Sequence, residues 1–309
     1  MKTALTALTA LTKSKTKYEF LENYRNNTPM VSHDLGEAIS ELTELPFLKS
    51  LEDLFQFWPK EVECYLPGVA DEVNSITTSV EAARELFKDG SGLIFNDADT
   101  ESDVLKRWVD ELISELGVSL LTYGRSLIYA IPAGKVTDPH FDQNINFVLQ
   151  IKGTKKWWVA PNHHVENPMT RHTIGTPVDP ELASYTDVMP DSFPADASEY
   201  TLMPGSFLFV PRGAWHTTKA SAEDTISISF TLTAPTWIDL LTAAMRARLA
   251  QSSHWRETAD FVNDKDFHPE ATEKFDFLLA GLANDVQTWQ AQDILSATEM
   301  NQLPDSDDA

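Results

Sequence analysis

The sequence predicts a mainly β core with helices before and after it. Between about residues 120 and 234, short runs rich in β-branched and aromatic residues are separated by Gly, Pro and Asn, which is typical of many short strands joined by turns. On both sides of this region the apolar residues recur with helical spacing instead. We therefore expect a β-sandwich or barrel flanked by helical segments.

The segment from about 17 to 116 is expected to be mostly helical, with short extended pieces. One helix covers 79–88 and ends at the Asp89-Gly90 stop signal. The next helix has Thr100 or Ser102 as its N-cap and ends at Gly117. Its apolar residues recur at i, i+3 and i+4, so one face should be buried: Val104, Leu105, Trp108, Val109, Leu112, Ile113 and Leu116.

Five runs are expected to form strands of the core: Leu127 to Ile131, Asn146 to Ile151, Lys156 to Val159, Ser206 to Val210 and Thr225 to Leu232. The stretch from Thr225 to Phe230 alternates with period two, which predicts a strand with one buried face. Residues 161–199 contain several prolines and no comparable run, so we expect a long, loop-rich insert there.

Helical spacing returns after Pro235. Two apolar stripes are expected, one formed by Trp237, Leu240, Leu241, Ala244, Met245 and Leu249, and one in a helix at about 271–290 formed by Phe275, Leu278, Leu279, Leu282, Val286 and Trp289. The expected organisation is a flexible N-terminus over 1–16, a domain over 17–235 with its β core at about 120–234, a helical region over 236–300 and an acidic tail over 301–309. The Ala-Leu-Thr triplets at 4–12 fit either a frayed helix or a disordered start.

Composition excludes several classes of protein. The chain has 47 acidic and 24 basic residues among 309, a net charge of −23, so it should repel nucleic acid and anionic membranes. The charge either serves solubility or attracts a basic protein partner. A single cysteine, Cys64, excludes an internal disulfide and a Cys-based zinc site. No apolar run approaches the ~20 residues needed to cross a bilayer, and we expect a cytoplasmic protein.

The most informative motif is His140-x-Asp142, followed 74 residues after the aspartate by His216. In an extended segment His140 and Asp142 lie on the same face, because the strand period is two. Two imidazoles and one carboxylate can hold one face of an octahedral Fe(II) and leave three positions open for an organic acid and O₂. Alone, a His-x-Asp pair is more often a surface ion pair, but this set suggests an oxygenase.

The surrounding residues carry a resemblance. The stretch from Thr137 to Lys156 resembles the core of the JmjC-domain (cupin-like) 2-oxoglutarate oxygenases, and is especially similar to the asparaginyl hydroxylase of hypoxia-inducible factor and to the ribosomal-protein hydroxylases. The stretch from Pro204 to His216 resembles the strand-turn-strand of the same family, and Phe20 to Val31 resembles its opening. The resemblance implies a double-stranded β-helix, the jelly-roll or cupin core, with N-terminal helices and a C-terminal helical region.

The resemblance also implies the chemistry. His140, Asp142 and His216 would be the ligands of one Fe(II), and 2-oxoglutarate and O₂ would be the cosubstrates of a dioxygenase. Decarboxylation of 2-oxoglutarate to succinate would be coupled to hydroxylation of a substrate C–H bond. A carboxylate at position 142 favours hydroxylation, because halogenating relatives need that coordination position for a halide.

Five further residues are implied in cosubstrate binding. Lys155, fifteen residues after His140, matches the family lysine that pairs with the distal carboxylate of 2-oxoglutarate, and Thr137 matches a hydroxyl donor to the same group. Asn146 matches a polar group near the metal-bound end. Ser229 falls near a family asparagine on the last strand, which leaves its role open. Tyr129 should face the same pocket by strand position and could add a phenol donor.

Other residues are assigned less specifically. Arg171 and Arg212 are expected to rim the mouth of the site and to touch substrate. His163 and His164 fit a solvent-facing pair better than a second metal site. Three tryptophans in the β-rich region are expected in the core rather than as a substrate platform: Trp157, Trp158 and Trp215.

Three functions stay open at this point. The first is an Fe(II)- and 2-oxoglutarate-dependent hydroxylase of a protein or peptide side chain. The second is the same chemistry on a small molecule, such as an amino acid or a natural-product intermediate. The third is a metal-binding cupin without catalysis, which would have no need of a buried lysine at position 155. Demethylation of methyl-lysine is disfavoured because no reader module or Cys-rich zinc motif is present. The C-terminal helices are expected to form a homodimer interface or to pack on the β core.

Overall fold

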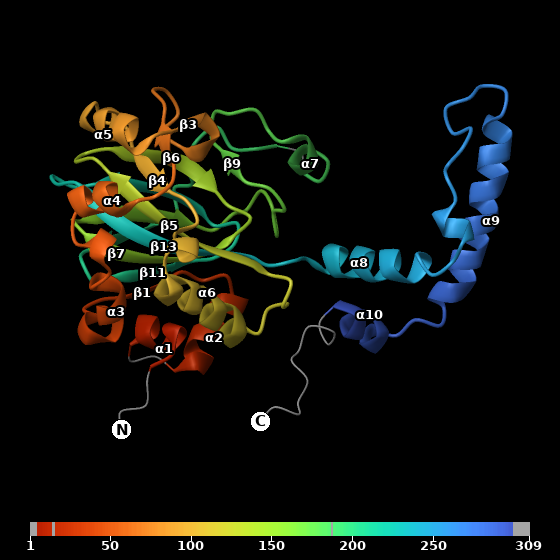
Figure 1. Ribbon diagram of the computed structural model, residues 1–309, viewed down its shortest axis with the longest axis horizontal. Helices are drawn as coiled ribbons and strands as arrows, with labels where there is room; N and C mark the ends of the chain where they lie inside the picture. The colour runs from red at the N-terminus through yellow and green to blue at the C-terminus, as the bar shows by residue number, and fades with distance from the viewer. Residues whose placement is uncertain (1–4, 14–15, 187, 299–309) are drawn as a thin grey trace. The chain divides into compact units, whose positions relative to one another are not determined.

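The computed structural model describes residues 5–13, 16–186 and 188–298. The chain divides into two units: Met1–Val118 with Tyr123–Thr233, and Ser119–Thr122 with Ala234–Ala309. The first unit contains both β-sheets, and the second contains the C-terminal helices (Figure 1). The acidic tail expected over 301–309 lies outside the described residues.

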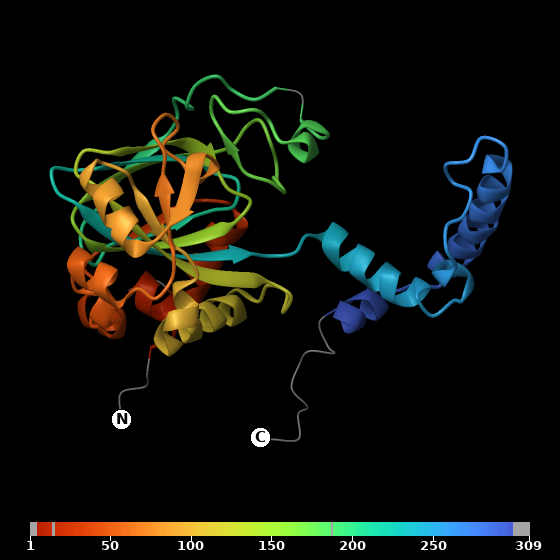
Figure 2. The same cartoon turned by 45° about the horizontal axis from the view of Figure 1, so that its top comes forward.

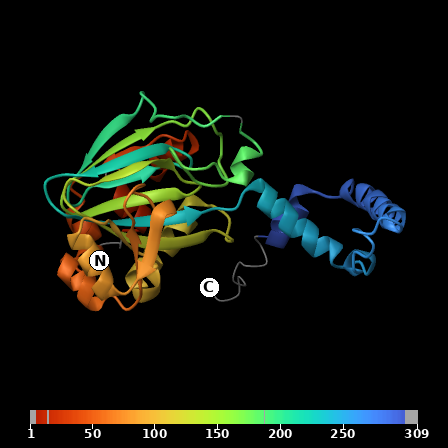
Figure 3. The same ribbon diagram turned by 90° about the horizontal axis from the view of Figure 1, so that it is seen from above.

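Two antiparallel sheets form the core of the first unit and lie against each other as layers (Figure 3). The larger sheet has the order β1 (Met30–Ser32), β11 (Phe207–Val210), β7 (Ile145–Lys152), β13 (Thr225–Thr233), β5 (Tyr123–Ile131), β4 (Leu93–Phe95), β2 (Val62–Tyr65) and β3 (Ser75–Thr78). The smaller has the order β10 (Ser198–Leu202), β8 (Lys155–Ala160), β12 (Trp215–Ala220), β6 (Val136–Phe141) and β9 (His172–Thr173). This arrangement confirms the jelly-roll core.

The prediction that β13 buries only one face is wrong. Every residue of this strand except Thr233 is buried. β13 lies between β5 and β7 in the larger sheet, and Ser227 and Ser229 line an internal pocket. On the other face, the ring of Phe230 stacks on Trp108 of a covering helix, with ring centroids 5.7 Å apart. The serines of β13 therefore face the pocket and its alternating apolar residues face the helix layer, so the alternation does not indicate a face exposed to solvent.

The covering helix is α6 (Asp103–Leu116), as predicted. Ser102 caps its start by accepting a hydrogen bond from the backbone N–H of Leu105, and Gly117 ends it in the left-handed conformation at φ +65°. Its buried residues belong to the predicted stripe: Leu105, Trp108, Val109, Leu112 and Leu116. The helix predicted over 79–88 is α5 (Val80–Lys88), which has Ser79 as its cap.

The remaining N-terminal elements include short helices around the larger sheet: α1 (Ala7–Thr12), α2 (Lys17–Arg25), α3 (Ser40–Thr43) and α4 (Leu51–Phe57), with 3₁₀ turns η1 (Gly36–Ile39), η2 (Pro46–Leu48), η3 (Glu72–Asn74) and η4 (Ala98–Glu101). The expectation of a flexible start over 1–16 does not hold for α1. Its Leu8 and Leu11 are buried, and the backbone N–H groups of Ala7 and Leu8 donate to carboxylates of α6. These bonds satisfy N–H groups that a helix start leaves unpaired.

The insert expected over 161–199 is anchored rather than free. It carries β9, the short helix α7 (Pro180–Ala183) and the start of β10, and it lies at one end of the two-sheet core (Figure 2). Val165 and Leu182 from the insert are buried in one cluster with Phe141 and Trp215 of the smaller sheet. The prolines thus mark a long excursion that adds strands to the edges of that sheet.

The second unit consists of α8 (Trp237–Leu249), η5 (His254–Arg256), α9 (His268–Val286) and α10 (Ala291–Thr298). Both predicted helices exist, but their apolar stripes remain largely exposed. In α8 only Leu240 and Ala244 are buried, and Trp237 is 80% exposed. In α9 no residue is buried. None of the described helices is long and apolar enough to cross a membrane.

Candidate metal centre

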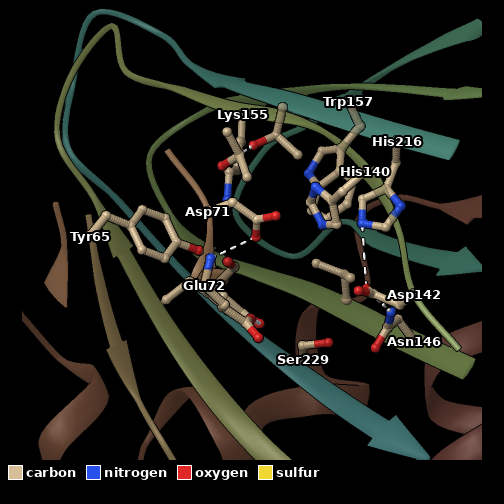
Figure 4. Close-up of a pocket in the computed structure, with 15 residues that line it drawn as sticks. Tyr65, Asp71, Glu72, His140, Asp142, Asn146, Lys155, Trp157, His216 and Ser229 are labelled. Atoms are coloured by element: carbon tan, nitrogen blue, oxygen red, sulfur yellow. Dashed lines mark hydrogen bonds and ion pairs between the residues drawn. The ribbon is translucent and has the colours of Figure 1, made fainter. Parts of the chain in front are cut away.

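Neighbouring strands bring the predicted triad together. His140 in β6 lies directly opposite His216 in β12, and Asp142 follows immediately after the end of β6. One ligand atom from each of the three residues lies within 4.8 Å of the others, and the three side chains point toward one another (Figure 4). Strand pairing therefore joins a local motif to a histidine far along the chain. Among the described residues, these three form the one cluster of this kind.

Backbone carbonyls orient both imidazoles. His140 Nδ1 lies 2.7 Å from the carbonyl oxygen of Asp138, and His216 Nδ1 lies 3.0 Å from that of Ala214. Since a carbonyl oxygen only accepts hydrogen bonds, each Nδ1 carries a proton, which leaves Nε2 as the nitrogen available to a metal ion. This second layer of hydrogen bonds is typical of metal-binding histidines. The residues present therefore fit a metal ion held by two Nε2 atoms.

Asp142 supplies the carboxylate. Its Oδ2 atom accepts a hydrogen bond of 3.1 Å from Asn146 Nδ2 and lies 3.7 Å from His216 Nε2. Asn146 is oriented in turn by the hydroxyl of Thr231, which donates to its Oδ1 at 2.8 Å. Burial raises the pKa of Asp142, but its electrostatic interactions with His140 and Arg171 outweigh this effect and lower the pKa to about 2. The carboxylate is thus ionised and its oxygen faces the two imidazoles.

Burial also keeps His216 neutral. Desolvation, followed by the proximity of His140, lowers the pKa of His216 to about 4. The ring of Trp157 stacks on His216 with centroids 5.7 Å apart, so this tryptophan belongs both to the core and to the wall of the site. A neutral imidazole at neutral pH is the form that binds metal. Two imidazole nitrogens and one carboxylate suit Fe(II), and would leave part of its coordination sphere open.

Lys155 lies at the end of the same cavity that is farther from Asp142 (Figure 4). It is 3% exposed, and no ion pair to it is found among the described residues. Its ammonium group lies over the rings of Tyr129 and Trp157, 5.8 and 5.4 Å from their centroids. Burial lowers its pKa to about 8. A buried cation with no anionic partner indicates a site for an anion.

The other predicted cosubstrate residues all line this cavity, and they differ in their hydrogen-bond partners. Thr137 accepts a hydrogen bond of 3.0 Å from the hydroxyl of Thr218. Ser229 lies 3.3 Å from the hydroxyl of Thr231. Tyr129 donates its phenol to Glu72 Oε1 at 2.9 Å, so its hydroxyl already has a partner. Asn146 is bonded to Asp142, at the metal end.

The sequence did not reveal the contribution of the N-terminal strands. Tyr65 at the end of β2 is 7% exposed and lines the cavity. Asp71 and Glu72, at the start of η3, line it as well. No sequence pattern identifies these residues as part of the site. They reach the cavity because β2 joins the larger sheet next to β4, and β2 lies far from the triad along the chain.

The two predicted rim arginines differ. Arg171 forms ion pairs with Asp71 at 2.6 Å, with Glu72 at 3.3 Å and with Asp142 at 3.5 Å. Arg212 instead donates to the backbone oxygen of Pro168 at 2.8 Å and does not line the cavity. It thereby ties the insert to the turn between β11 and β12.

The remaining residues singled out in the sequence make contacts that stabilise the fold or lie at the surface. His163 is exposed and lies 3.0 Å from Asp196, which agrees with the expectation that His163 and His164 face solvent. Trp215 is fully buried and packs edge-on against Phe141, so it is a core residue. Trp158 is half-buried and donates to Glu199.

Comparisons with known proteins agree with this geometry. Residues 103–240 match the family model described as the JmjC domain. The uncharacterized protein YxbC of Bacillus subtilis (strain 168) is 31% identical over 301 residues, which cover 94% of this chain and 89% of that protein.

Solved structures of one Escherichia coli protein are similar in fold. The ribosomal oxygenase YcfD superposes with a TM-score of 0.54 at 16% identity, covering 92% of this chain and 70% of that one. The structure of YcfD in complex with cobalt and 2-oxoglutarate gives 0.53 at 16% identity, with the same coverage. That in complex with cobalt and succinic acid gives 0.54 at 15% identity, covering 92% and 69%.

Proposed function

Because the chain belongs to the JmjC-domain family of 2-oxoglutarate oxygenases, we propose that it is an Fe(II)-dependent hydroxylase of a protein or peptide side chain. One observation carries the proposal: the His140, Asp142 and His216 triad shares a cavity with Lys155, a buried cation that has no anionic partner in the part of the chain that the structure describes. A metal site and an anion site in one cavity suit a cosubstrate that carries a carboxylate at each end.

Lys155 and Thr137 are assigned to the distal carboxylate of 2-oxoglutarate. Lys155 supplies the charge, and Thr137 supplies a hydroxyl that lines the same cavity. Tyr65 is proposed as a further donor, since its phenol lines the cavity, whereas that of Tyr129 is bonded to Glu72. Ser229 is assigned to the cavity wall beside Asn146.

When bound, Fe(II) supplies the one-electron chemistry that couples O₂ reduction to decarboxylation of 2-oxoglutarate and oxidation of a substrate C–H bond. The residues of the chain position the groups that take part in this chemistry. Asn146 and the carbonyl oxygens beside the two histidines keep the three ligands in one orientation. The buried strands around the cavity exclude water, which protects a reactive site from side reactions. Asp142 occupies the coordination position that a halide would need, which supports hydroxylation over halogenation.

A polypeptide substrate is supported by two observations. The similar YcfD structures are those of a ribosomal oxygenase. The net charge of −23 would attract a basic protein, and that attraction weakens as the salt concentration rises. Small-molecule hydroxylation is the second candidate, because the triad lies in a cavity that is lined mainly by buried side chains.

Incubation with Fe(II), 2-oxoglutarate and a panel of basic ribosomal peptides tests the substrate. The expected result is a peptide that gains the mass of one oxygen atom, with succinate formed in equal amount. His216→Ala is the matched control and should give neither product. Turnover of a free amino acid or other metabolite alone, with every peptide unchanged, would select the small-molecule function instead.

A homodimer through the C-terminal helices is proposed as well. In the single chain Trp237 is 80% exposed, Phe277 is 62% exposed and Phe275 is 55% exposed. An apolar surface of this kind on a soluble protein marks an interaction site. A second copy of α8 and α9 would cover it.

A further inference from the structure

Arg171 connects the insert to the carboxylates of the metal centre and of the cavity wall. It immediately precedes β9, and β9 pairs with β6 so that Thr173 lies opposite the metal ligand His140. Its side chain is 21% exposed and reaches three carboxylates: Asp71, Glu72 and Asp142. The insert therefore contacts a metal ligand through one side chain.

The three contacts of Arg171 differ in kind. Its guanidinium donates hydrogen bonds to Asp71 at 2.6 Å and to Glu72 at 3.3 Å. Its Nε lies 3.5 Å from Asp142 Oδ1, and this Nε is buried without a hydrogen-bond partner. The interaction with Asp142 is thus a charge attraction without a hydrogen bond, whereas Asp71 and Glu72 anchor the side chain.

Arg171 and a metal ion would act on opposite oxygens of the same carboxylate. Oδ2 of Asp142 faces His216 Nε2 and Asn146, so it is the oxygen on the metal side. Oδ1 faces Arg171. Two cations on one half-buried carboxylate repel each other, and this repulsion is strong where water is largely excluded. Each cation must therefore weaken the binding of the other to Asp142.

We propose that Arg171 is a positioning residue that serves as the counter-ion of Asp142 in the metal-free protein and competes with the metal for this carboxylate. Metal binding loosens the contact of Arg171 with Asp142 and, through it, the residues that lead into β9. By linkage, the same coupling makes Arg171 lower the affinity of the triad for metal. Arg171 thus holds Asp142 in place while no metal is bound, and the residues that lead into β9 become less firmly held once a metal binds. This inference rests on the metal site of the proposed function.

Binding of Mn²⁺, measured by calorimetry on the full chain without turnover, tests the competition. Arg171→Gln removes the competing cation and leaves Asp71 and Glu72 as uncompensated anions, so the dissociation constant should fall by about tenfold or more. Arg171→Lys keeps the charge and should stay near the wild-type value. A merely structural role predicts the opposite, since a disturbed site would bind Mn²⁺ more weakly.

Arg212→Gln is the matched control. Arg212 also ties the insert to the core, but through the backbone oxygens of Asn167 and Pro168 rather than through the carboxylate of a metal ligand. This variant should loosen the insert toward protease and leave Mn²⁺ affinity unchanged. An equal rise in affinity in Arg212→Gln, or an unchanged or weakened affinity in Arg171→Gln, would overturn the proposal.

Hydrogen exchange of the wild-type protein gives a second test that needs no variant. Amides of residues 161–173 should exchange faster with Mn²⁺ than without it, and slower or equal exchange would contradict the proposal. A wild-type protein that binds no Mn²⁺ would remove the metal site itself. Normal Mn²⁺ binding without the Arg171 effects would reject only this inference.

Discussion

At the scale of residues, the cavity combines a preformed set of two imidazoles and one carboxylate with a buried cation that has no anionic partner among the described residues. The triad and Lys155 could be predicted from the sequence, because their spacing is local except for His216. Tyr65, Asp71 and Glu72 could not, because they reach the cavity through pairing of distant strands. The same limit applies to Tyr129, whose strand position was predicted but whose bond to Glu72 was not.

Removal of the Lys155 ammonium should weaken binding of 2-oxoglutarate far more than it slows the chemistry. Lys155→Ala leaves a buried dianion without its partner, which typically costs ~3–5 kcal/mol. The apparent KM for 2-oxoglutarate should therefore rise by at least ~100-fold, at 1.4 kcal/mol per tenfold. Steady-state kinetics check this, with Lys156→Ala on the same strand as the control, since Lys156 pairs with Glu199 at the surface. A near-normal KM would remove Lys155 from the site.

The pH dependence of cosubstrate binding follows from the same residue. Burial lowers the pKa of Lys155 to about 8, so in the free protein its ammonium form is present below that pH and is lost above it. The KM for 2-oxoglutarate should then increase as the pH rises above about 8. Lys155→Arg stays charged throughout and should lose this dependence. A flat wild-type profile between neutral pH and pH ~9 would contradict the assignment.

At the scale of elements, the sequence predicted the helices that carry clear caps and stripes, such as α6. It misjudged β13, because alternation of serine and apolar residues has the same period whether the polar face meets water or an internal cavity. It left open whether residues 4–12 form a helix, because the start of α1 is held by hydrogen bonds to Glu111 and Glu115 of α6, which lie far along the chain.

The contact between α6 and β13 should be a major source of stability. Trp108 is 1% exposed, stacks on Phe230 and donates its indole N–H to Glu41 at 2.5 Å. Trp108→Ala should lower the free energy of unfolding by about 3–5 kcal/mol, because it removes a large buried ring and leaves a cavity. Urea denaturation measures this, with Lys106→Ala on the exposed face of α6 expected within ~0.5 kcal/mol of wild type. A Trp108→Ala loss no larger than that of the control would contradict the packing.

At the scale of the whole molecule, one unit contains the cavity and the other presents apolar helices. The stripes of α8 and α9 were predicted from their spacing, but a single sequence does not distinguish packing within the chain from packing on a second copy. Trp237 and Phe275, one from each stripe, are exposed in the single chain, and the homodimer stays a prediction.

The proposed dimer predicts a sedimentation mass of two chains at micromolar concentration. Phe275→Asp places a charge on the predicted apolar stripe of α9 and should shift the protein toward the monomer, because a buried unpaired charge is costly. Phe57→Asp, at a 51% exposed phenylalanine in the first unit, is the control and should leave the mass unchanged. A wild-type monomer at this concentration would reject the dimer.

The central claim is that His140, Asp142 and His216 hold the iron that consumes 2-oxoglutarate. The most direct measurement is iron content together with succinate release, in the wild type and in His140→Ala and His216→Ala. The wild type should hold one iron per chain and release succinate only when Fe(II), 2-oxoglutarate and O₂ are all present, and both variants should hold no iron and release no succinate. Full iron content in both variants, or an iron-loaded wild type that releases no succinate with or without substrate, would contradict the account.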